Sequence, residues 1–262
     1  MIHGAVLGSP ISHSLSPLLH STAYKFLSVE AAYQAIDLAS GQLSAFLTET
    51  KLNSLSLTMP LKEEALTIAD EVSEISMQVS SGNTLSLVQG RWQLTSTDVA
   101  GFNFSLQSIE TPQSCLIIGA GATARALAAA LNPQVQKIDV VTRNSQRIPD
   151  MNRAAGRRDI TYLPWELSDE INRYDLVVNT TPAGAADFFC SAVKNPQGVF
   201  FDVLYSPWPT EMMRLWSNST IDGLELLIHQ AISQVEIFTG LAVERASMYT
   251  LLREVALAKI ST

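Results

Sequence analysis

The sequence has few cysteines, few charged residues and little positive charge. Only Cys115 and Cys190 are cysteines among 262 residues, which is too few for a disulfide framework. Charged residues make up 16% of the chain, and 17 basic against 25 acidic residues give a net charge of −8. That balance argues against a nucleic-acid surface, because such surfaces cluster basic residues that displace counterions from phosphates. We therefore expect neither a disulfide-rich secreted protein nor a nucleic-acid partner.

Membrane, export and metal signals are also missing. No apolar run approaches the roughly 18 residues that suggest a membrane span, and the most apolar region, residues 116–131, contains Arg125. The first residues lack a basic segment followed by an apolar stretch and a cleavage site, so nothing predicts a signal peptide. The four histidines have no metal-ligand spacing. These observations predict a cytoplasmic protein with no metal site and no membrane partner.

Apolar residues make up 47% of the sequence, enough for a large buried core. Short β-like runs alternate with helical stretches, which is typical of an α/β protein with a largely parallel sheet covered on both faces. Ser16 is expected to cap a helix that has Pro17 at its first position. We expect further helices at residues 42–50, 61–70, 122–131, 224–240 and 242–260, and strands at 5–8, 32–36, 54–58, 84–88, 92–95, 115–118, 137–141, 175–178 and 199–203, with 84–95 as a hairpin.

A glycine turn stands where a strand would pass into a helix. Residues 117–125 read Ile-Ile-Gly-Ala-Gly-Ala-Thr-Ala-Arg and fit the dinucleotide fingerprint, with Ala124 in place of the third glycine. Gly119 permits the tight turn, and Gly121 lets backbone N–H groups approach a pyrophosphate at the helix N-terminus. An ordinary strand–helix junction can show the same residues, but the order of strand, turn and helix favours nucleotide binding.

The next predicted strand bears on the choice between NAD and NADP. Asp139 has the spacing of an acid that binds the ribose 2′-OH of NAD, but it lies inside the strand. The strand leads into Thr142, and Arg143 and Arg147 follow with no acid beside them. Two arginines four residues apart could clamp a 2′-phosphate, although a solvated basic loop would look the same. This pattern favours NADP.

A second α/β series begins near Ser114. The two helices expected at the C-terminus connect no strands of that second series. We therefore expect them to pack on the first α/β series. The sequence thus predicts two domains. Residues 1–100 with 223–262 would form a discontinuous α/β domain, and residues 101–222 a Rossmann-like, doubly wound domain that binds NADP.

Seven motifs follow one another between residue 4 and about residue 240. They are GSPISHSLSP at 8–17, LTMPLK at 57–62, GNTL at 82–85, TD at 97–98, VNTTPAG at 178–184, DVLYSP at 202–207 and GLELLIHQA at 223–231. Each motif alone is modest, but their order around a GxGxxA turn is specific. Together they resemble the shikimate dehydrogenase family.

The resemblance implies the reversible reduction of 3-dehydroshikimate to shikimate with NADPH, in the biosynthesis of aromatic amino acids. It implies Lys62 as the catalytic lysine with Asp98 as its companion. The substrate carboxylate would bind Ser14 and Ser16, the ring hydroxyls would bind Thr58, Asn83, Asp98 and Gln230, and Tyr205 would lie near the substrate. The cofactor would bind Gly119, Ala120, Gly121, Ala122, Thr142, Arg143, Arg147, Thr181 and Gly223.

The chemistry is consistent with those residue types. Hydride delivery to a ketone builds negative charge on its oxygen, so a positioned proton donor is needed. Lys62 could supply the proton, and its charge would stabilise the developing alkoxide. The nicotinamide carries the redox step, so neither a metal nor a nucleophilic side chain is required. Taken alone, however, Lys62 could equally be a solvated residue at the start of a helix.

The chain departs from the family pattern at three positions. Ser56 and Ser96 stand where the family often or usually has asparagine, and Val99 stands where it usually has glycine.

The alternatives are a broader quinate/shikimate dehydrogenase that uses NAD, a catalytically silent NADP- and shikimate-binding sensor, and a folate dehydrogenase of similar architecture. Ser14 argues against quinate, the two arginines against NAD, and Lys62 with Asp98 against the sensor, whereas the 14–17 motif gives the folate enzyme no support. A monomer or a homodimer is expected.

Overall fold

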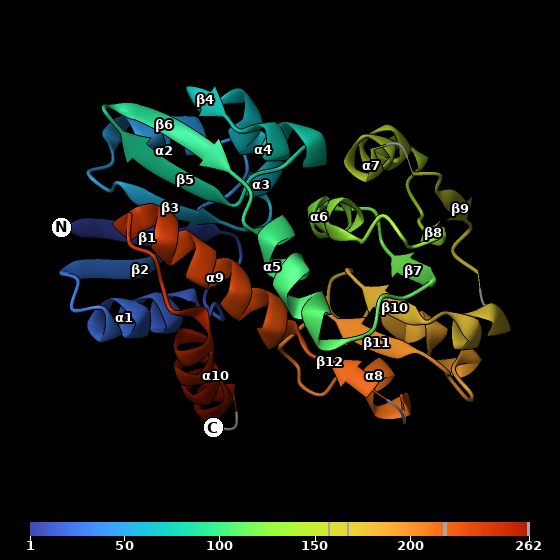
Figure 1. Cartoon of the computed structure of the whole chain (residues 1–262). Coiled ribbons are helices and arrows are strands. Elements are labelled where there is room, and N and C mark those ends of the chain that lie inside the picture. The colour runs from blue at the N-terminus through green and yellow to red at the C-terminus, as the bar shows by residue number, and fades with distance from the viewer. Residues whose placement is uncertain (157, 167, 217–218, 261–262) are drawn as a thin grey trace. The chain divides into compact units, whose positions relative to one another are not determined.

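The computed structural model describes residues 1–156, 158–166, 168–216 and 219–260. The chain divides into two compact units, residues 1–101 with 228–262 and residues 102–227. Each unit contains its own six-stranded sheet (Figure 1). The α/β architecture expected from the alternating pattern is confirmed.

The sheet of the first unit has mixed strand directions. Its order is β2-β1-β3-β5-β6-β4, in which β1 pairs in parallel with β2 and β3, whereas β5 runs antiparallel to both β3 and β6. The predicted hairpin is confirmed, and its turn uses positive φ angles at Gln89 and Gly90. The strand bounds are β1 Ile2–Gly8, β2 Ala31–Asp37, β3 Ser54–Leu57, β4 Glu71–Val72, β5 Thr84–Val88 and β6 Arg91–Thr95.

Two expectations about the helices of this unit are wrong. Ser16 does not cap the first helix but is its first residue, so that Leu15 is at the N-cap and Pro17 is second, and Ser14 Oγ accepts a hydrogen bond from the Ser16 N–H at 3.2 Å. The helix expected at 61–70 ends at Glu64 and passes into a 3₁₀ turn, and Asp70 then accepts from the Trp92 N–H on the sheet. The helices are α1 Ser16–Phe26, α2 Leu43–Glu49, α3 Leu61–Glu64, α4 Glu74–Val79, the part of α9 Gly223–Thr239 from residue 228, and α10 Arg245–Ile260.

The sheet of the second unit is parallel throughout, in the order β12-β11-β10-β7-β8-β9. Helices α6 and α7 pack together, while 3₁₀ segments 169–173 and 186–192 cover the sheet face that carries Leu116 and Ile118. This is the doubly wound, Rossmann-like arrangement that was expected. The elements are the part of α5 Asp98–Ser105 from residue 102, β7 Ser114–Ile118, α6 Ala122–Ala130, β8 Lys137–Val141, α7 Ile148–Ala155, β9 Thr161–Leu163, β10 Leu176–Asn179, β11 Val199–Asp202, α8 Glu211–Leu215, β12 Ser219–Ile221 and the part of α9 up to residue 227.

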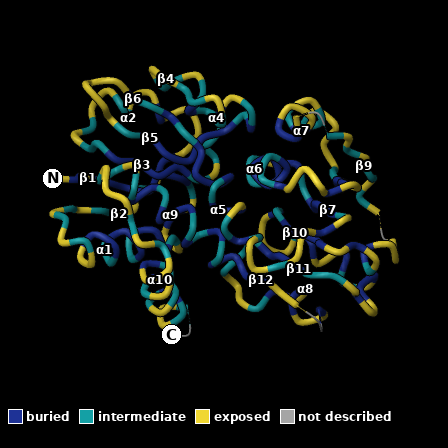
Figure 2. Tube along the Cα trace, in the orientation of Figure 1, coloured by how far each residue is buried: buried dark blue, intermediate teal, exposed yellow. Residues whose placement is uncertain are grey.

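Each sheet is buried along its central strands, as the dark tube segments in Figure 2 show. Leucines dominate the core of the first unit, among them Leu7, Leu55 and Leu85. In the second unit the core includes Phe200, stacked on Trp216. Cys115 is fully buried, and burial raises the pKa of its thiol, so this cysteine fills core space rather than acting as a nucleophile.

Candidate active site

Several predicted site residues of the first unit gather at one edge of its sheet. The parallel strands β1 and β3 end at this edge, and β6, which runs in the same direction, also ends there. Thr58 follows β3, Asp98 follows β6, and Asn83 precedes the antiparallel β5. Ligands of open α/β sheets bind at the carboxyl ends of parallel strands. The topology therefore brings side chains from distant parts of the sequence to the sheet edge at which such ligands bind.

Lys62 and Asp98 form an ion pair at this edge. Lys62 Nζ lies 2.6 Å from Asp98 Oδ2, and the two side chains are 17% and 5% exposed. Asp98 is the first residue of α5, where the helix dipole favours a carboxylate. The Lys62 carbonyl accepts from the Gly82 N–H at 2.9 Å, which ties α3 to the segment before β5. The ammonium group is thus held by one buried carboxylate and a fixed backbone.

The Asn83 carboxamide joins this pair to helix α9. Asn83 Nδ2 donates to Asp98 Oδ1 at 2.8 Å and to Gln230 Oε1 at 3.0 Å. Its Oδ1 accepts from the Thr97 N–H at 2.8 Å, which is one of the contacts that orient the amide. Lys62, Asn83, Asp98 and Gln230 therefore form one connected polar cluster of donors and acceptors, the set needed to bind the hydroxyls of a polyol ring.

The serines lie on the loop after β1, next to the loop after β3. Ser9 N–H donates to the Met59 carbonyl at 3.0 Å, and a Cβ on Gly8 would meet Thr58 Cγ2 at 2.4 Å. Only glycine permits this close approach. Within the described residues, no hydrogen bond joins Ser14 or Ser16 to Lys62 or Asp98. The Ser16 side chain is buried, whereas Ser14 is half-buried.

The predicted pyrophosphate turn of the second unit has the two properties expected of its glycines. Gly119 has φ +107°, and a Cβ there would lie 2.6 Å from Thr180 Oγ1. Gly121 precedes α6, and a Cβ there would meet no protein atom within 4 Å. The first glycine is required by the backbone and its neighbours, whereas the second leaves open the space that a phosphate would need. Ala120 and Ala122 complete the turn.

The basic residues after β8 are arranged around an aromatic side chain. The Arg143 guanidinium lies over the Trp165 ring, 4.7 Å from its centroid, and Trp165 packs edge-on against Phe189. Thr142 Oγ1 accepts from the Asn144 N–H at 3.1 Å, which shapes the turn that leads to Arg147. Asp139, which has the sequence spacing of an NAD-binding acid, is only 3% exposed. Its carboxylate accepts a hydrogen bond from the Tyr174 hydroxyl and pairs with Lys137.

Thr181 belongs to a buried polar chain at the end of β10. Its N–H and its hydroxyl both donate to Asn179 Oδ1, at 3.0 and 2.7 Å, and Asn179 Nδ2 donates to Asp202. Asp202 is fully buried, which raises the pKa of its carboxyl. Gly223 is required by close packing, because its Cβ would lie 2.3 Å from the Val203 carbonyl oxygen. Tyr205 lies in the loop after β11, two residues beyond Val203, and is half-buried.

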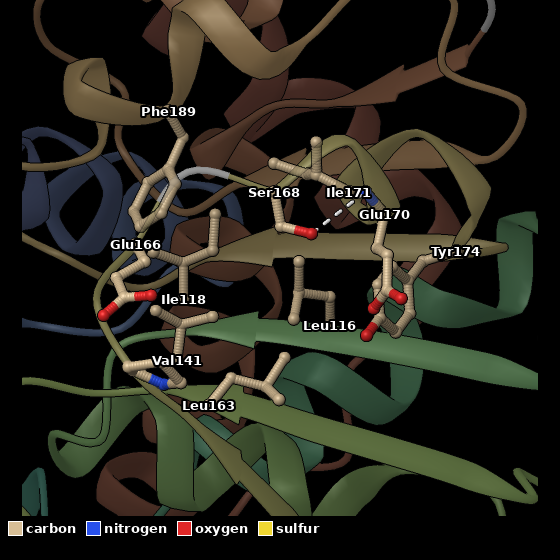
Figure 3. Close-up of a pocket in the computed structure, with 11 residues that line it drawn as sticks. Leu116, Ile118, Val141, Leu163, Glu166, Ser168, Glu170, Ile171, Tyr174 and Phe189 are labelled. Atoms are coloured by element: carbon tan, nitrogen blue, oxygen red, sulfur yellow. Dashed lines mark hydrogen bonds between the residues drawn. The ribbon is translucent and has the colours of Figure 1, made fainter.

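A separate cavity of about 340 Å³ lies in the second unit, shown in Figure 3. Apolar side chains from three strands line it, including Leu116, Val141 and Leu163, and Glu166 and Glu170 also border it. No predicted site residue is among the described residues that line this cavity. Its lining residues Val141 and Phe189 adjoin Thr142 in sequence and Trp165 in space, respectively.

Sequence reasoning missed the polar residues behind the cluster, above all Gln234, and also missed Trp165 and Asp202. Gln230 and Gln234 are four residues apart and so share one face of α9, a spacing that could have drawn attention to the second glutamine. Across the described ranges, no three metal-ligating side chains gather. Over the same ranges, no helix has the length and apolarity needed to cross a membrane.

Comparison with known proteins adds family evidence to this geometry. The family model described as the shikimate dehydrogenase substrate binding domain matches residues 6–85. The model described as shikimate / quinate 5-dehydrogenase matches residues 105–198, and that of the shikimate 5′-dehydrogenase C-terminal domain matches residues 223–253.

Proteins similar over most of this chain were also found. A shikimate dehydrogenase (NADP(+)) of Prochlorococcus marinus is 31% identical over 261 residues, covering 90% of this chain and 91% of that protein. The shikimate 5-dehydrogenase structure from Thermus thermophilus, in complex with NADP(H) and shikimate, is 30% identical with a TM-score of 0.83, covering 97% of this chain and 99% of that one. A Corynebacterium glutamicum quinate dehydrogenase in complex with NAD is 28% identical with a TM-score of 0.83 over the same shares. This chain belongs to the shikimate dehydrogenase family.

Proposed function

We propose that this chain is an NADP-dependent shikimate dehydrogenase, which reversibly reduces 3-dehydroshikimate to shikimate in aromatic amino acid biosynthesis. The observation that carries the proposal is the Lys62–Asp98 pair, joined through Asn83 to Gln230 at the edge of the first sheet. An ammonium beside a buried carboxylate, with amides around it, suits a ketone on a hydroxylated ring. The NADP- and shikimate-bound relative of the same fold supports this choice of ligands.

In the proposed mechanism, Lys62 carries the proton. Its Nζ donates to the carbonyl oxygen as hydride reaches the carbon, and it accepts a proton in the reverse direction. Asp98 orients the ammonium through the 2.6 Å contact and holds a ring hydroxyl, together with Asn83 and Gln230. Thr58 binds a further hydroxyl, Ser14 and Ser16 bind the substrate carboxylate, and Tyr205 lies close to the substrate.

NADP supplies the hydride chemistry when it is bound, and the residues of the second unit fit it. The open side of Gly121 gives the pyrophosphate room beside the backbone N–H groups that begin α6. Arg143 and Arg147 would bind a 2′-phosphate, together with Thr142, which follows β8 and precedes both arginines in the sequence. The remaining residues that would bind NADP are Gly119, Ala120 and Ala122 at the turn, and Thr181 and Gly223 at the nicotinamide.

The proposal assigns residues 1–100 with 223–262 to the substrate and residues 101–222 to NADP. The match of the substrate-binding family model to residues 6–85 supports the first assignment. The glycine turn at 119–121 supports the second. We further propose a cytoplasmic enzyme that acts as a monomer or homodimer on a small-molecule substrate, without nucleic acid or membrane partners.

Quinate oxidation with NAD is the second candidate, favoured by the quinate dehydrogenase relative. The test is a comparison of initial rates by absorbance of the reduced nicotinamide, for shikimate or quinate paired with NADP or NAD. The proposal predicts the highest kcat/KM for shikimate with NADP. Faster turnover of quinate with NAD would move the protein to the second candidate. NADP binding without turnover of either substrate would make it a sensor instead.

A further inference from the structure

Gln234 lies one helical turn beyond Gln230 on α9 and is only 1% exposed. Its side-chain amide has a partner for each of its hydrogen-bonding positions. Oε1 accepts from Ser56 Oγ at 2.7 Å and from His20 Nε2 at 3.1 Å. Nε2 donates to the Asn83 carbonyl and to Thr84 Oγ1, both at 3.0 Å. A buried amide with four partners is strongly oriented.

These partners allow only one orientation of the amide. The Asn83 carbonyl can only accept, so Gln234 Nε2 must face it, and Oε1 must face the other side. His20 then donates from Nε2, and its Nδ1 accepts from the Tyr24 hydroxyl at 3.0 Å. Burial lowers the pKa of His20 to about 4, which keeps the ring neutral at physiological pH.

The contacts of Gln234 lead directly to the amide of Asn83. Thr84 Oγ1 accepts from Gln234 and donates to Asn83 Oδ1 at 2.9 Å. Thr84 and the Thr97 N–H both donate to Oδ1, so Asn83 Nδ2 faces Asp98 and Gln230. The backbone of Asn83 is held as well, since its carbonyl accepts from both Gln234 and the Leu57 N–H.

Gln234 occupies this position because residue 56 is small. Ser56 is 4% exposed, donates to Gln234 and accepts from the Tyr33 hydroxyl. A longer side chain at 56 would enter the space of the Gln234 amide, because only 2.7 Å separates their oxygens. Ser56 is also one of the three departures from the family pattern noted in the sequence.

We propose that Gln234, which accepts a hydrogen bond from Ser56, is a positioning residue that orients the Asn83 amide for recognition of the substrate hydroxyls. The inference rests on the proposed function and adds to it a residue that does not touch the substrate. Without the Gln234 amide, Asn83 loses one of the two donors to its carbonyl, and Thr84 loses the group that sets its hydroxyl direction. Substrate binding weakens, while cofactor binding is untouched.

The first test uses Gln234→Met, which keeps the side-chain length and removes all four polar contacts. We expect KM for shikimate to rise about tenfold, which is the size of effect expected when one hydrogen bond to the substrate is lost. KM for NADP should change less than twofold. Thr84→Val is a second variant that cuts the link to Asn83 and should shift KM for shikimate in the same direction. Ser233→Ala is the matched control on α9, because Ser233 contacts His229 and Arg245 rather than Asn83.

An unchanged KM for shikimate in both Gln234→Met and Thr84→Val, beside active wild-type enzyme, would overturn the inference while leaving the proposed function intact. An equal rise in Ser233→Ala would also overturn it, since general loosening of α9 would then suffice. Wild-type protein inactive on shikimate would instead refute the proposed function.

The second test concerns the pairing of Ser56 with Gln234. Ser56→Asn alone should weaken shikimate binding by crowding the Gln234 amide. Ser56→Asn combined with Gln234→Ala should recover kcat/KM to within about threefold of wild type, because the asparagine can supply a carboxamide in the vacated space. A double variant no better than folded Gln234→Ala would overturn the pairing.

Discussion

Burial decides how strongly each charged or polar group of the site acts. The Lys62–Asp98 pair has side chains 17% and 5% exposed, so solvent and salt screen it less than the surface pair of Lys194 and Asp169. Removing either member of such a pair leaves the other charge without compensation. The pair is therefore held in one geometry, as proton transfer to a substrate requires.

Arg143 should set the preference for the phosphorylated cofactor. Its guanidinium lies on the Trp165 ring, which limits the directions in which it can donate. We expect Arg143→Ala to raise KM for NADP by roughly 10- to 100-fold, the effect of a charged hydrogen bond, and KM for NAD by less than threefold. Steady-state kinetics with both cofactors measures this ratio. Equal effects on NADP and NAD would place the arginine away from the 2′-phosphate.

His20 should make stability depend on pH. Burial lowers its pKa from 6.5 to about 4, so between these values the unfolded chain binds a proton that the folded protein does not. The contribution is complete above pH 6.5 and is lost as the pH falls toward 4, by about 2 kcal/mol at pH 5.

Urea unfolding at several pH values between 7 and 5 measures this loss, and His20→Gln is the comparison. The variant should show a smaller decrease in unfolding free energy over that range, whatever its absolute stability. Identical pH slopes for the two proteins would show that His20 does not titrate as its burial requires.

Among the helices and strands, those with a strong local pattern were predictable. The strand at 115–118 is a continuous apolar run, the strand at 137–141 is rich in β-branched residues, and the glycines at 119 and 121 mark the turn between β7 and α6. The short strands β4, β9 and β12, of two or three residues, were missed because neighbouring strands, not local sequence, hold them in place. Gln234 was missed because a polar residue in a helix that also carries His229 and Gln230 does not reveal which of them has buried partners on other elements.

The turn before α6 offers a matched pair of glycine substitutions. Gly119→Ala places a Cβ at φ +107° against Thr180, so we expect a loss of about 1–3 kcal/mol in unfolding free energy. Gly121→Ala meets no protein atom within 4 Å, so the fold should be retained while NADP affinity falls at least tenfold.

Thermal melting without cofactor and a fluorescence titration with NADP separate these two effects. Unchanged NADP affinity in a folded Gly121→Ala protein would show that no phosphate approaches this turn.

For the whole molecule, sequence order was more informative than composition. The seven motifs predicted a family and a cofactor, and the family and the α/β fold are confirmed. The contacts that join Lys62 to Asp98 and Asn83 to Gln230 span 36 and 147 residues of sequence, and only the folded first unit reveals them. Spacing could suggest their roles by resemblance but could not show that they meet.

The most direct measurement is the rate of shikimate-dependent NADP reduction by wild-type protein and by Lys62→Ala, together with calorimetric binding of shikimate to each. The account predicts turnover in the wild type and a decrease in kcat of at least about 100-fold in the variant, the usual size of a lost general acid–base group. Shikimate affinity should change far less, because Asn83, Gln230 and the serines remain. A folded Lys62→Ala enzyme with kcat near that of the wild type would contradict the account, because the proton would then come from elsewhere.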